Sequence, residues 1–442
     1  MDRKRDDGEM GGTAGRPAGN LEFFAVDVFC GAGGTTRGLI DAGGYVVAGI
    51  DKDARCRQTY IENNRNRFLD NAPPEFLHRD IFPADKRHPG GQQAALIEDL
   101  DRIIPRFRKQ GWRVPWLFAI CAPCQPFTRL ARKELSRKRK VGRQLDRHLL
   151  CEAVKLVERY MPELVLSENV QGIGDPKYGG VWEDFRQSLE ALGYVTGAKV
   201  VCTSRFGIPQ YRKRSILLAV RRDVAREDRY VDSKGVSLLV PEADPDASTV
   251  SVCEAIGHLP PIKAGVLHPE IPNHRARDLS LLNQRRLAAA KPGQSNAYMA
   301  DTPNGDLSLK CHRRVNRKLG TRCFTDVYTR MHPDRPSPTI TTKCHSISNG
   351  RFGHYDVKQR RGISLREAAI LQSFPEDYVF YPTHQIEPIA RMIGNAVPPK
   401  LASFYCRYLV RSIEPAVVFR GRTGRTSVSP RRRSSRSVPR SS

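Results

Sequence analysis

Residues 23–34 of the chain read FFAVDVFCGAGG, a short apolar run that ends in a cluster of glycines. Aromatic and branched residues in a run of this length are typical of a buried β-strand. Glycines at its carboxyl end let the backbone approach a nucleotide at the start of the next helix. No Gly-Lys-Ser/Thr follows, and Thr36 stands where a dinucleotide fingerprint has its third glycine. The stretch therefore favours a nucleoside site at the edge of an α/β sheet, without a P-loop or a full dinucleotide motif.

The alternation of apolar runs with helical spacing continues to residue 222. It predicts strands at residues 45–50, 116–120 and 164–166, and helices at residues 53–68, 94–107 and 149–160. Short, continuously apolar strands separated by helices are typical of a mostly parallel sheet that is covered on both faces. We therefore expect a doubly wound α/β domain. Asp51 and Asp80 would follow its second and third strands, either as ligands for a nucleoside or as solvated carboxylates.

This regular pattern is interrupted once and then returns. Residues 223–333 are rich in Pro, Gly, Asn and Arg and have weak periodicity, which predicts a separate module of irregular structure. Afterwards Ser364 and Glu367 form a capping box at the start of a helix, and Pro375 follows its end. A last helix is expected over residues 399–413.

The domain organisation follows from these segments. Residues 21–222 and 334–419 would form one main domain, because the C-terminal part returns to complete it, and residues 223–333 would form an inserted domain. Residues 1–20 are expected to be a flexible tail. Residues 420–442 hold eight Arg and no acid, and we expect them to be disordered.

The net charge of +26, from 73 basic and 47 acidic residues, predicts a polyanionic partner, with nucleic acid ahead of a membrane surface. Residues 129–147 contribute +7, residues 310–330 contribute +6 and residues 420–442 contribute +8. No apolar run approaches the roughly 20 residues of a membrane span. The first twenty residues do not resemble a signal peptide, so we expect a cytoplasmic protein.

The eleven cysteines have no regular spacing, which favours reduced thiols over disulfides. Cys121 and Cys124 form a C-x-x-C pair that also fits metal or redox chemistry. Cys311, Cys323, Cys344 and His345 could be assembled into a zinc site, but their irregular spacing favours scattered thiols. We expect no metal.

Two neighbouring strand ends carry side chains that suit a reaction. The strand at residues 116–120 leads to Cys124, where a cysteine is well placed to be a nucleophile, although a lone cysteine also fits a small buried residue. The next strand leads to Glu168, which neighbouring strands would bring near Cys124. No His stands at an obvious third position, which disfavours a protease-like triad.

A third motif, Gln210-Tyr211-Arg212-Lys213-Arg214, stands at the entrance to a later strand. Alternation sends Gln210, Arg212 and Arg214 to one side, where the two guanidinium groups could face Glu168. A basic edge-strand terminus is the other interpretation.

In this order the motifs resemble the C5-cytosine-specific DNA methyltransferase family of bacterial type, across nearly all of residues 23–413. The resemblance rests on an ordered set of motifs: Phe29-x-Gly31-x-Gly33-Gly34, Asp51, Asp80, Pro123-Cys124-Gln125, Glu168-Asn169-Val170, Gln210-x-Arg212-x-Arg214, Arg335-Pro336-Ser337-Pro338-Thr339-Ile340-Thr341, Arg366-Glu367-Ala368-Ala369 and Gly394-Asn395-Ala396-Val397-Pro398-Pro399. Cys121, where the family often has Gly, and Thr128, where Ser is usual, depart from the pattern without touching Cys124.

The resemblance implies the fold of S-adenosylmethionine-dependent methyltransferases, with residues 223–333 as the target-recognition domain. It implies methyl transfer from S-adenosylmethionine to carbon 5 of a flipped-out cytosine in double-stranded DNA, through a covalent Cys124 adduct at carbon 6. The implied catalytic residues are Cys124, Glu168, Gln210, Arg212 and Arg214. The implied cofactor contacts are Phe29, Gly31, Gly33, Asp51, Asp80, Pro123, Asn395 and Val397. The DNA-binding candidates are Gln125, Arg129, Arg132, Lys133, Arg137, Arg313, Arg314, Arg317 and Arg322.

The organism-level expectation is a cytoplasmic bacterial monomer, associated with the nucleoid through DNA. It would serve restriction–modification or another phage defence, with or without partner proteins. Two other functions fit the same motifs. An RNA (tRNA) cytosine-C5 methyltransferase would share the catalytic set, although the long segment before Arg335 favours DNA recognition. A non-catalytic DNA-binding relic is disfavoured because Cys124 and Glu168 are both present.

Overall fold

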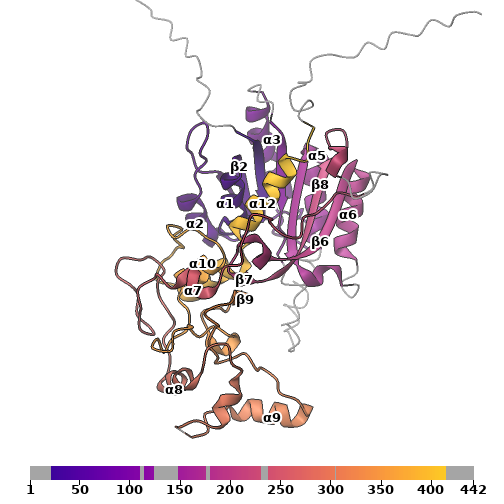
Figure 1. Ribbon diagram of the computed structural model, residues 1–442. Helices are drawn as coiled ribbons and strands as arrows, with labels where there is room; N and C mark the ends of the chain where they lie inside the picture. The colour runs from indigo at the N-terminus through magenta and orange to yellow at the C-terminus, as the bar shows by residue number, and fades with distance from the viewer. Residues whose placement is uncertain are drawn as a thin grey trace, which may run out of the picture.

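The structure is a computed structural model that describes residues 21–109, 114–123, 148–175, 180–229, 237–303 and 305–414. The two expected tails, residues 1–20 and 420–442, lie outside these ranges. Within them the chain forms a large lobe built on a β-sheet and a smaller lobe of loops and short helices (Figure 1).

The sheet of the large lobe has seven strands among the described residues, in the order β3-β2-β1-β4-β5-β8-β6. The strands are β1 (Phe23–Val28), β2 (Gly44–Asp51), β3 (Glu75–His78), β4 (Trp116–Ile120), β5 (Leu164–Val170), β6 (Tyr194–Cys202) and β8 (Lys213–Arg221). Only β8 pairs antiparallel to its neighbours, so the prediction of a mostly parallel sheet is confirmed. The strand order reverses between β1 and β4, and open α/β sheets bind ligands at the carboxyl ends of such strands.

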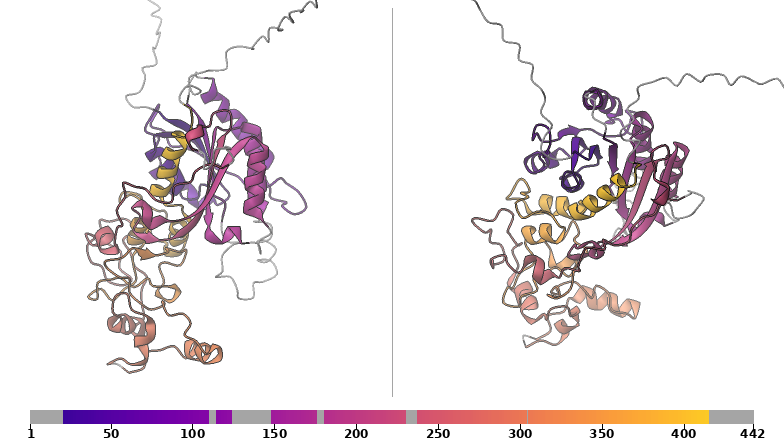
Figure 2. Two further views of the ribbon diagram at one scale, coloured as in Figure 1. Left: turned by 45° about the vertical axis from the view of Figure 1, so that its right-hand side comes forward. Right: turned by 45° about the horizontal axis from the view of Figure 1, so that its top comes forward.

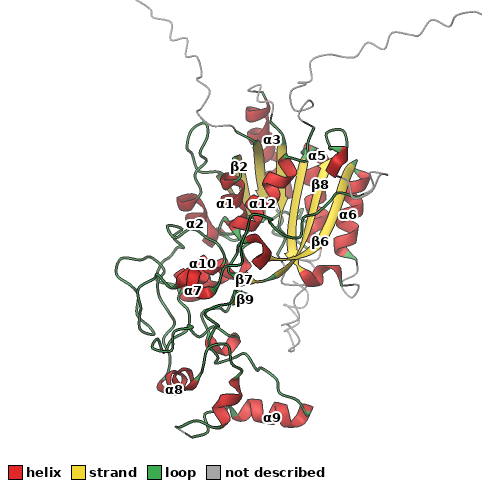
Figure 3. Ribbon diagram, viewed as in Figure 1, coloured by secondary structure: helices red, strands yellow, loops and turns green. Residues whose placement is uncertain are grey.

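Both faces of the sheet are covered by helices, as predicted (Figures 2 and 3). One face packs on α3 (Gln93–Arg108), α5 (Leu149–Tyr160) and α6 (Val181–Ala191). The other packs on α1 (Gly34–Asp41) and α12 (Pro399–Val410). Along β1, Phe24 and Val26 enter the first core while Phe23 and Ala25 enter the second. Because both faces of β1 are buried, the strand is almost entirely apolar. Helix α12, from the C-terminal part of the chain, completes the large lobe.

Two elements differ in length from the prediction by four or more residues. The expected helix over residues 53–68 is a short 3₁₀ turn followed by α2 (Arg57–Asn63). It ends early because Asn64 adopts an extended conformation and the buried Asn66 amide bonds to the Val46 backbone N–H and C=O, at 2.8 and 3.0 Å. In contrast, β5 runs four residues beyond the predicted Leu166 to Val170.

The smaller lobe has two parts with separate cores. Nearer the sheet, α7 (Val252–Ile256), α10 (Leu365–Leu371) and α11 (Ile386–Asn395) share one apolar cluster. Farther away, a second cluster lies around α8 (Leu281–Ala289) and includes Leu287 and Met299. Helix α9 (Lys310–Leu319) lies at the far end of this part (Figure 1).

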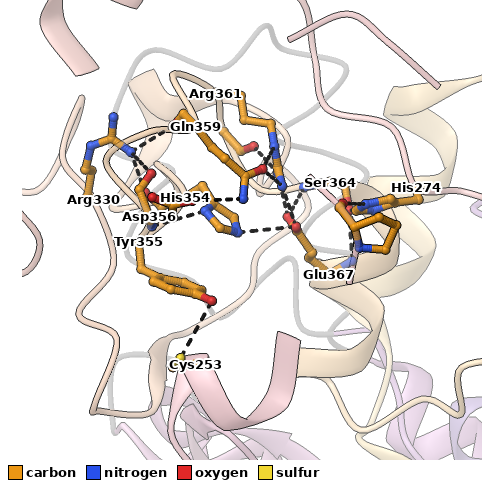
Figure 4. Close-up of polar contacts among 12 residues, drawn as sticks. Cys253, His274, Arg330, His354, Tyr355, Asp356, Gln359, Arg361, Ser364 and Glu367 are labelled. Atoms are coloured by element: carbon orange, nitrogen blue, oxygen red, sulfur yellow. Dashed lines mark hydrogen bonds and ion pairs between the residues drawn. The ribbon is translucent and has the colours of Figure 1, made fainter. Parts of the chain in front are cut away.

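A buried polar network joins the two parts (Figure 4). The predicted capping box of α10 is confirmed, since the Ser364 hydroxyl accepts from the Glu367 amide and the Glu367 carboxylate accepts from the Ser364 amide. Both oxygens of Glu367 also accept from Arg361, at 2.7 and 2.8 Å. Nearby, the fully buried Arg330 donates to backbone carbonyls that include those of His354 and Asp356. These contacts fix the loop before α10 to the outer part of the lobe.

None of the helices in the described ranges is long and apolar enough to cross a membrane. The ten cysteines within those ranges are all free.

Candidate active site and cofactor cavity

A cavity of about 250 Å³ opens at the carboxyl ends of β1, β2 and β4. Its lining includes all but one of the expected cofactor residues: Phe29, Gly31, Asp51, Asp80, Pro123, Asn395 and Val397. Three expected catalytic residues line the same cavity: Glu168, Arg212 and Arg214. Side chains more than 300 residues apart in the sequence therefore meet at the point where the strand order reverses.

Asp51 ends β2 and lies against the glycine turn after β1. Its Oδ2 accepts a hydrogen bond from the Gly31 amide at 2.8 Å, and its Oδ1 accepts one from the Asp53 amide, also at 2.8 Å. Burial raises the pKa of Asp51, and these two amides oppose the shift. Each oxygen keeps a lone pair for a further donor, which is what a ribose diol would need.

The turn after β1 has an unusual backbone. Phe29, a bulky residue, has a φ of 67°, in the left-handed region that favours glycine. Gly31 has a φ of 52° and faces open space, so the backbone there is uncovered. Gly33 is different: it does not line the cavity, and a Cβ on it would lie 2.3 Å from the Asn64 side chain. Gly33 therefore serves the close packing of the turn.

Asp80 lies two residues beyond the end of β3. Its Oδ1 accepts from the Phe82 amide at 3.1 Å, which holds the carboxylate at the cavity wall. A carboxylate accepts several hydrogen bonds, so Asp80 can also accept one from an amino group of a bound ligand.

The extension of β5 beyond β4 positions the segment that leads to Cys124. The two strands pair as far as Ala119 and Leu166. Beyond that point the Ser167 hydroxyl donates to the Ile120 carbonyl at 2.5 Å, and the Asn169 amide donates to the Ala122 carbonyl at 3.1 Å. Glu168 lies between these two anchors, so the strand that carries the carboxyl group also fixes the approach to Pro123.

Glu168 is paired with Arg214. The Arg214 Nε lies 2.7 Å from the Glu168 Oε1, and both side chains are about nine-tenths buried. Register explains the contact, because Val170 of β5 pairs with Arg214 of β8. Cys121 lies close by: burial and the nearby Glu168 raise its pKa, so its thiol is uncharged at neutral pH.

The predicted alternation at residues 210–214 is confirmed, since Gln210, Arg212 and Arg214 are buried while Tyr211 and Lys213 are exposed. Gln210 and Tyr211 form a short strand, β7 (Gln210–Tyr211), beside β9 (Ser337–Pro338).

Of the three buried side chains, Arg214 contacts Glu168 directly. Gln210 accepts from the Ile340 amide and donates to Gln372, and it lies outside the cavity lining. Arg212 donates to the carbonyls of Ile340, Gly394 and Ala396. It thereby holds Gly394 and Ala396, the two neighbours of Asn395, in place. The segment that contains Asn395 forms one wall of the cavity.

Sequence reasoning missed part of the lining. Pro388, Arg391 and Met392 line the cavity from α11, in line with Asn395. Their spacing of three, four and seven residues places them on one face of a helix, which is the signal that could have found them. Thr35 and Cys121 also face the cavity and were not assigned to it.

Several predicted residues lie outside the described residues: Cys124, Gln125, Arg129, Arg132, Lys133 and Arg137. The other DNA-binding candidates, Arg313, Arg314, Arg317 and Arg322, are exposed on α9 and the loop after it, away from the cavity. In the described part of the chain no three His, Cys, Asp or Glu side chains gather as a metal site.

The lining suits S-adenosylmethionine. Two carboxylates with spare lone pairs, Asp51 and Asp80, match a ribose diol and an adenine amino group, and the uncovered Gly31 backbone allows a close approach. Apolar contacts come from Phe29 and Val397.

Comparison with known proteins shows the family of the chain. The profile of the C-5 cytosine-specific DNA methylase family matches residues 106–411. The chain belongs to this family. It is thus a DNA cytosine-5 methyltransferase, and the family and fold imply S-adenosylmethionine as the methyl donor.

Two curated relatives are Type II enzymes. The Type II methylase M.HgiDII of Herpetosiphon aurantiacus is 34% identical over 391 residues, which cover 88% of this methyltransferase and 95% of the relative. The Type II methyltransferase M1.HphI of Haemophilus parahaemolyticus is 28% identical over 387 residues, which cover 86% of this chain and 85% of the relative.

A solved structure shares the fold. A prophage-encoded E. coli protein, described as a DNA modification methyltransferase, aligns with a TM-score of 0.59 at 18% identity, covering 88% of this chain and 99% of its own.

Proposed function

We propose that this enzyme methylates carbon 5 of a cytosine within a specific sequence of double-stranded DNA, as the modification enzyme of a restriction–modification or other phage-defence system. The single observation that carries the proposal is the buried Glu168–Arg214 pair, which lies in the same cavity as Asp51 and beside Pro123. The Type II relatives support the link to restriction–modification.

In the proposed reaction the Cys124 thiolate adds to carbon 6 of the cytosine. Carbon 5 is a poor nucleophile in the aromatic ring, and the new sulfur–carbon bond makes it enamine-like. Glu168 shares a proton with N3 of the ring, which stabilises the charge that arrives there. Arg214 holds the Glu168 carboxyl in place through the 2.7 Å contact. Once carbon 5 carries the methyl group, its proton passes to solvent, the sulfur–carbon bond breaks to release the Cys124 thiolate, and the C5–C6 double bond is restored.

S-adenosylmethionine supplies the methyl group when it is bound. Asp51 would hold its ribose, Asp80 its adenine amino group and Phe29 the adenine face. Asn395 and Val397 would complete the pocket, held there through Arg212. The cytosine must leave the duplex to reach this cavity, at a cost of a few kcal/mol. Basic residues 129–147 and residues 223–333, the proposed target-recognition domain, would offset that cost through contacts with DNA.

The experiment that tests this function incubates the purified protein with labelled S-adenosylmethionine and either duplex DNA or tRNA. We expect label in duplex DNA, and bisulfite sequencing of DNA from an expressing host should show methylated cytosines with a common flanking sequence. Transfer to tRNA alone would make the protein an RNA enzyme. DNA binding without transfer to either substrate would make it a non-catalytic relic.

A further inference from the structure

Helix α9 lies at the far end of the smaller lobe (Figures 1 and 2). It has one cationic face and no buried residue. Its ten residues include five cations and no acid. At 100° per residue, Lys310, Arg313, Arg314, Arg317 and Lys318 fall within an arc of about 140°. A helix whose polar face holds only cations is suited to a polyanion.

The opposite face of α9 fixes the direction in which the cations point. His312, Val315 and Asn316 lie there and are half-buried. The Asn316 side chain accepts from the Cys323 amide at 2.8 Å, and the His312 ring stacks on Phe324 with centroids 5.1 Å apart. The loop that follows α9 therefore packs on this side of the helix, and the cationic residues lie on the opposite, exposed side.

The three arginines of this face are not equivalent. Arg313 is paired with Asp306 and donates to the Ser308 hydroxyl at 2.9 Å, so its guanidinium is already engaged. Arg314 and Arg317 lie nearer the middle of the arc, are exposed, and pair with no carboxylate that the described ranges contain. A guanidinium group of this kind can donate two parallel hydrogen bonds to O6 and N7 of guanine.

We infer that α9 enters the major groove of the target duplex and that Arg314 and Arg317 select guanines in the recognised sequence. The diameter of a helix, about 10–12 Å, matches a major groove about 12 Å wide. Lys310 and Lys318, at the ends of the helix, contact phosphates, and Arg313 orients the helix through Asp306. This inference rests on the proposed methylation of DNA and names the residues that select its sequence.

The test measures which sequences the full-length protein methylates. A pool of duplexes with randomised bases around one cytosine is methylated and then read by bisulfite sequencing. The wild type should prefer guanine at two or more positions. Arg314→Ala and Arg317→Ala should each relax the preference at one position, by about 10- to 100-fold, while methylation of the pool continues. Arg285→Ala, which removes an exposed arginine of α8, is the matched control and should keep the wild-type profile.

Each outcome bears on the inference. A wild-type profile without guanine, or an unchanged profile in Arg314→Ala and Arg317→Ala, would overturn it. A uniform loss of methylation in both variants, with unchanged circular dichroism and cofactor affinity, would assign the two arginines to phosphates and would also contradict it. If the wild type methylates no duplex at all, the proposed function itself fails, so the two failures are distinguishable.

Discussion

Arginine serves different purposes at the two ends of this molecule. In the cavity, Arg212 and Arg214 are buried and fixed, one on backbone carbonyls and the other on Glu168. On α9, Arg314 and Arg317 are exposed. Buried arginines with fixed partners set the geometry of the reaction, whereas exposed ones can act only through a bound partner. Substitutions at the two ends should therefore change different measured quantities.

The largest effect is expected at the cavity. Glu168→Gln keeps the size of the side chain and an acceptor for Arg214 but removes the carboxyl group that we propose shares a proton with the cytosine. Methyl transfer at saturating substrate should fall by about 10²- to 10⁴-fold. S-adenosylmethionine affinity, measured by calorimetry, and the flanking-sequence preference of any residual methylation should stay unchanged. A rate within a few-fold of the wild type would remove Glu168 from the reaction.

A second prediction concerns two buried carboxylates with opposite pKa shifts. Burial raises the pKa of Asp27 in the large lobe to about 7, despite hydrogen bonds from Thr36. Burial also acts on Glu367 at the junction with the smaller lobe, but the charge and hydrogen bonds of Arg361 hold its pKa well below its usual range. A buried carboxyl group is thus stabilised as the acid where no cation faces it, and as the carboxylate where one does.

Asp27 and Glu367 should make the unfolding free energy depend on pH in opposite directions. Folded Asp27 binds a proton more tightly than the unfolded chain does, so its contribution is complete below about pH 4 and is lost as the pH rises toward 7. Asp27→Asn should remove a decline of about 2 kcal/mol in unfolding free energy between pH 5 and pH 8, measured by urea denaturation. The lowered pKa of Glu367 stabilises the folded protein at pH values above the ordinary pKa of a glutamate, and this contribution is lost as the pH falls. Glu367→Gln should therefore reduce the loss of unfolding free energy at acidic pH. If the unfolding free energies of Asp27→Asn and the wild type fell equally between pH 5 and pH 8, the role assigned to Asp27 would be contradicted.

A smaller effect is expected for cofactor binding. In Asp51→Asn an NH₂ group replaces one of the two carboxylate oxygens. Those oxygens accept hydrogen bonds from the Gly31 and Asp53 amides and would also accept from the ribose, so at least one acceptor is lost. S-adenosylmethionine affinity should fall by about tenfold, corresponding to one or two lost hydrogen bonds. Asp101→Asn, at an exposed carboxylate paired with Arg159, is the matched control. An unchanged affinity in Asp51→Asn would move the ribose site away from β2.

The smallest effect is expected at the ends of α9. Lys310→Ala and Lys318→Ala should each reduce the dependence of log affinity on log salt concentration by about one unit of slope. The methylated sequence and the maximal rate should not change, because phosphates carry no sequence information. A changed sequence profile in either variant would show that the lysines read bases.

The core of the large lobe was predictable because its strands are short, apolar and buried on both faces. Residues 116–120 and 149–160 were assigned with the bounds that the structure has, β4 and α5. The alternation of Gln210, Arg212 and Arg214 was predictable for the same reason, since one side of that segment is buried.

The partners of these residues were not predictable, because they depend on tertiary contacts. No local pattern reveals that Arg212 meets Gly394 or that Gln210 meets Gln372, which lie more than 150 residues away. Helix α9 was missed because it buries nothing, so apolar periodicity, the main signal for a helix, is absent. The early end of α2 depends on Asn66 reaching β2, which is again a long-range contact.

The central claim, that Cys124 and the cavity around Glu168 act on carbon 5 of cytosine in DNA, is tested most directly by trapping. In duplex DNA with 5-fluorocytosine in place of cytosine, methyl transfer leaves no C5 proton to remove, so the Cys124 adduct cannot be released. With S-adenosylmethionine present, we expect a complex that survives denaturation and whose cross-linked peptide, identified by mass spectrometry, carries the DNA on Cys124. The Cys124→Ser variant should form none while it still binds the cofactor. The absence of a complex with an otherwise active wild type, or attachment at Cys121 instead, would contradict the account.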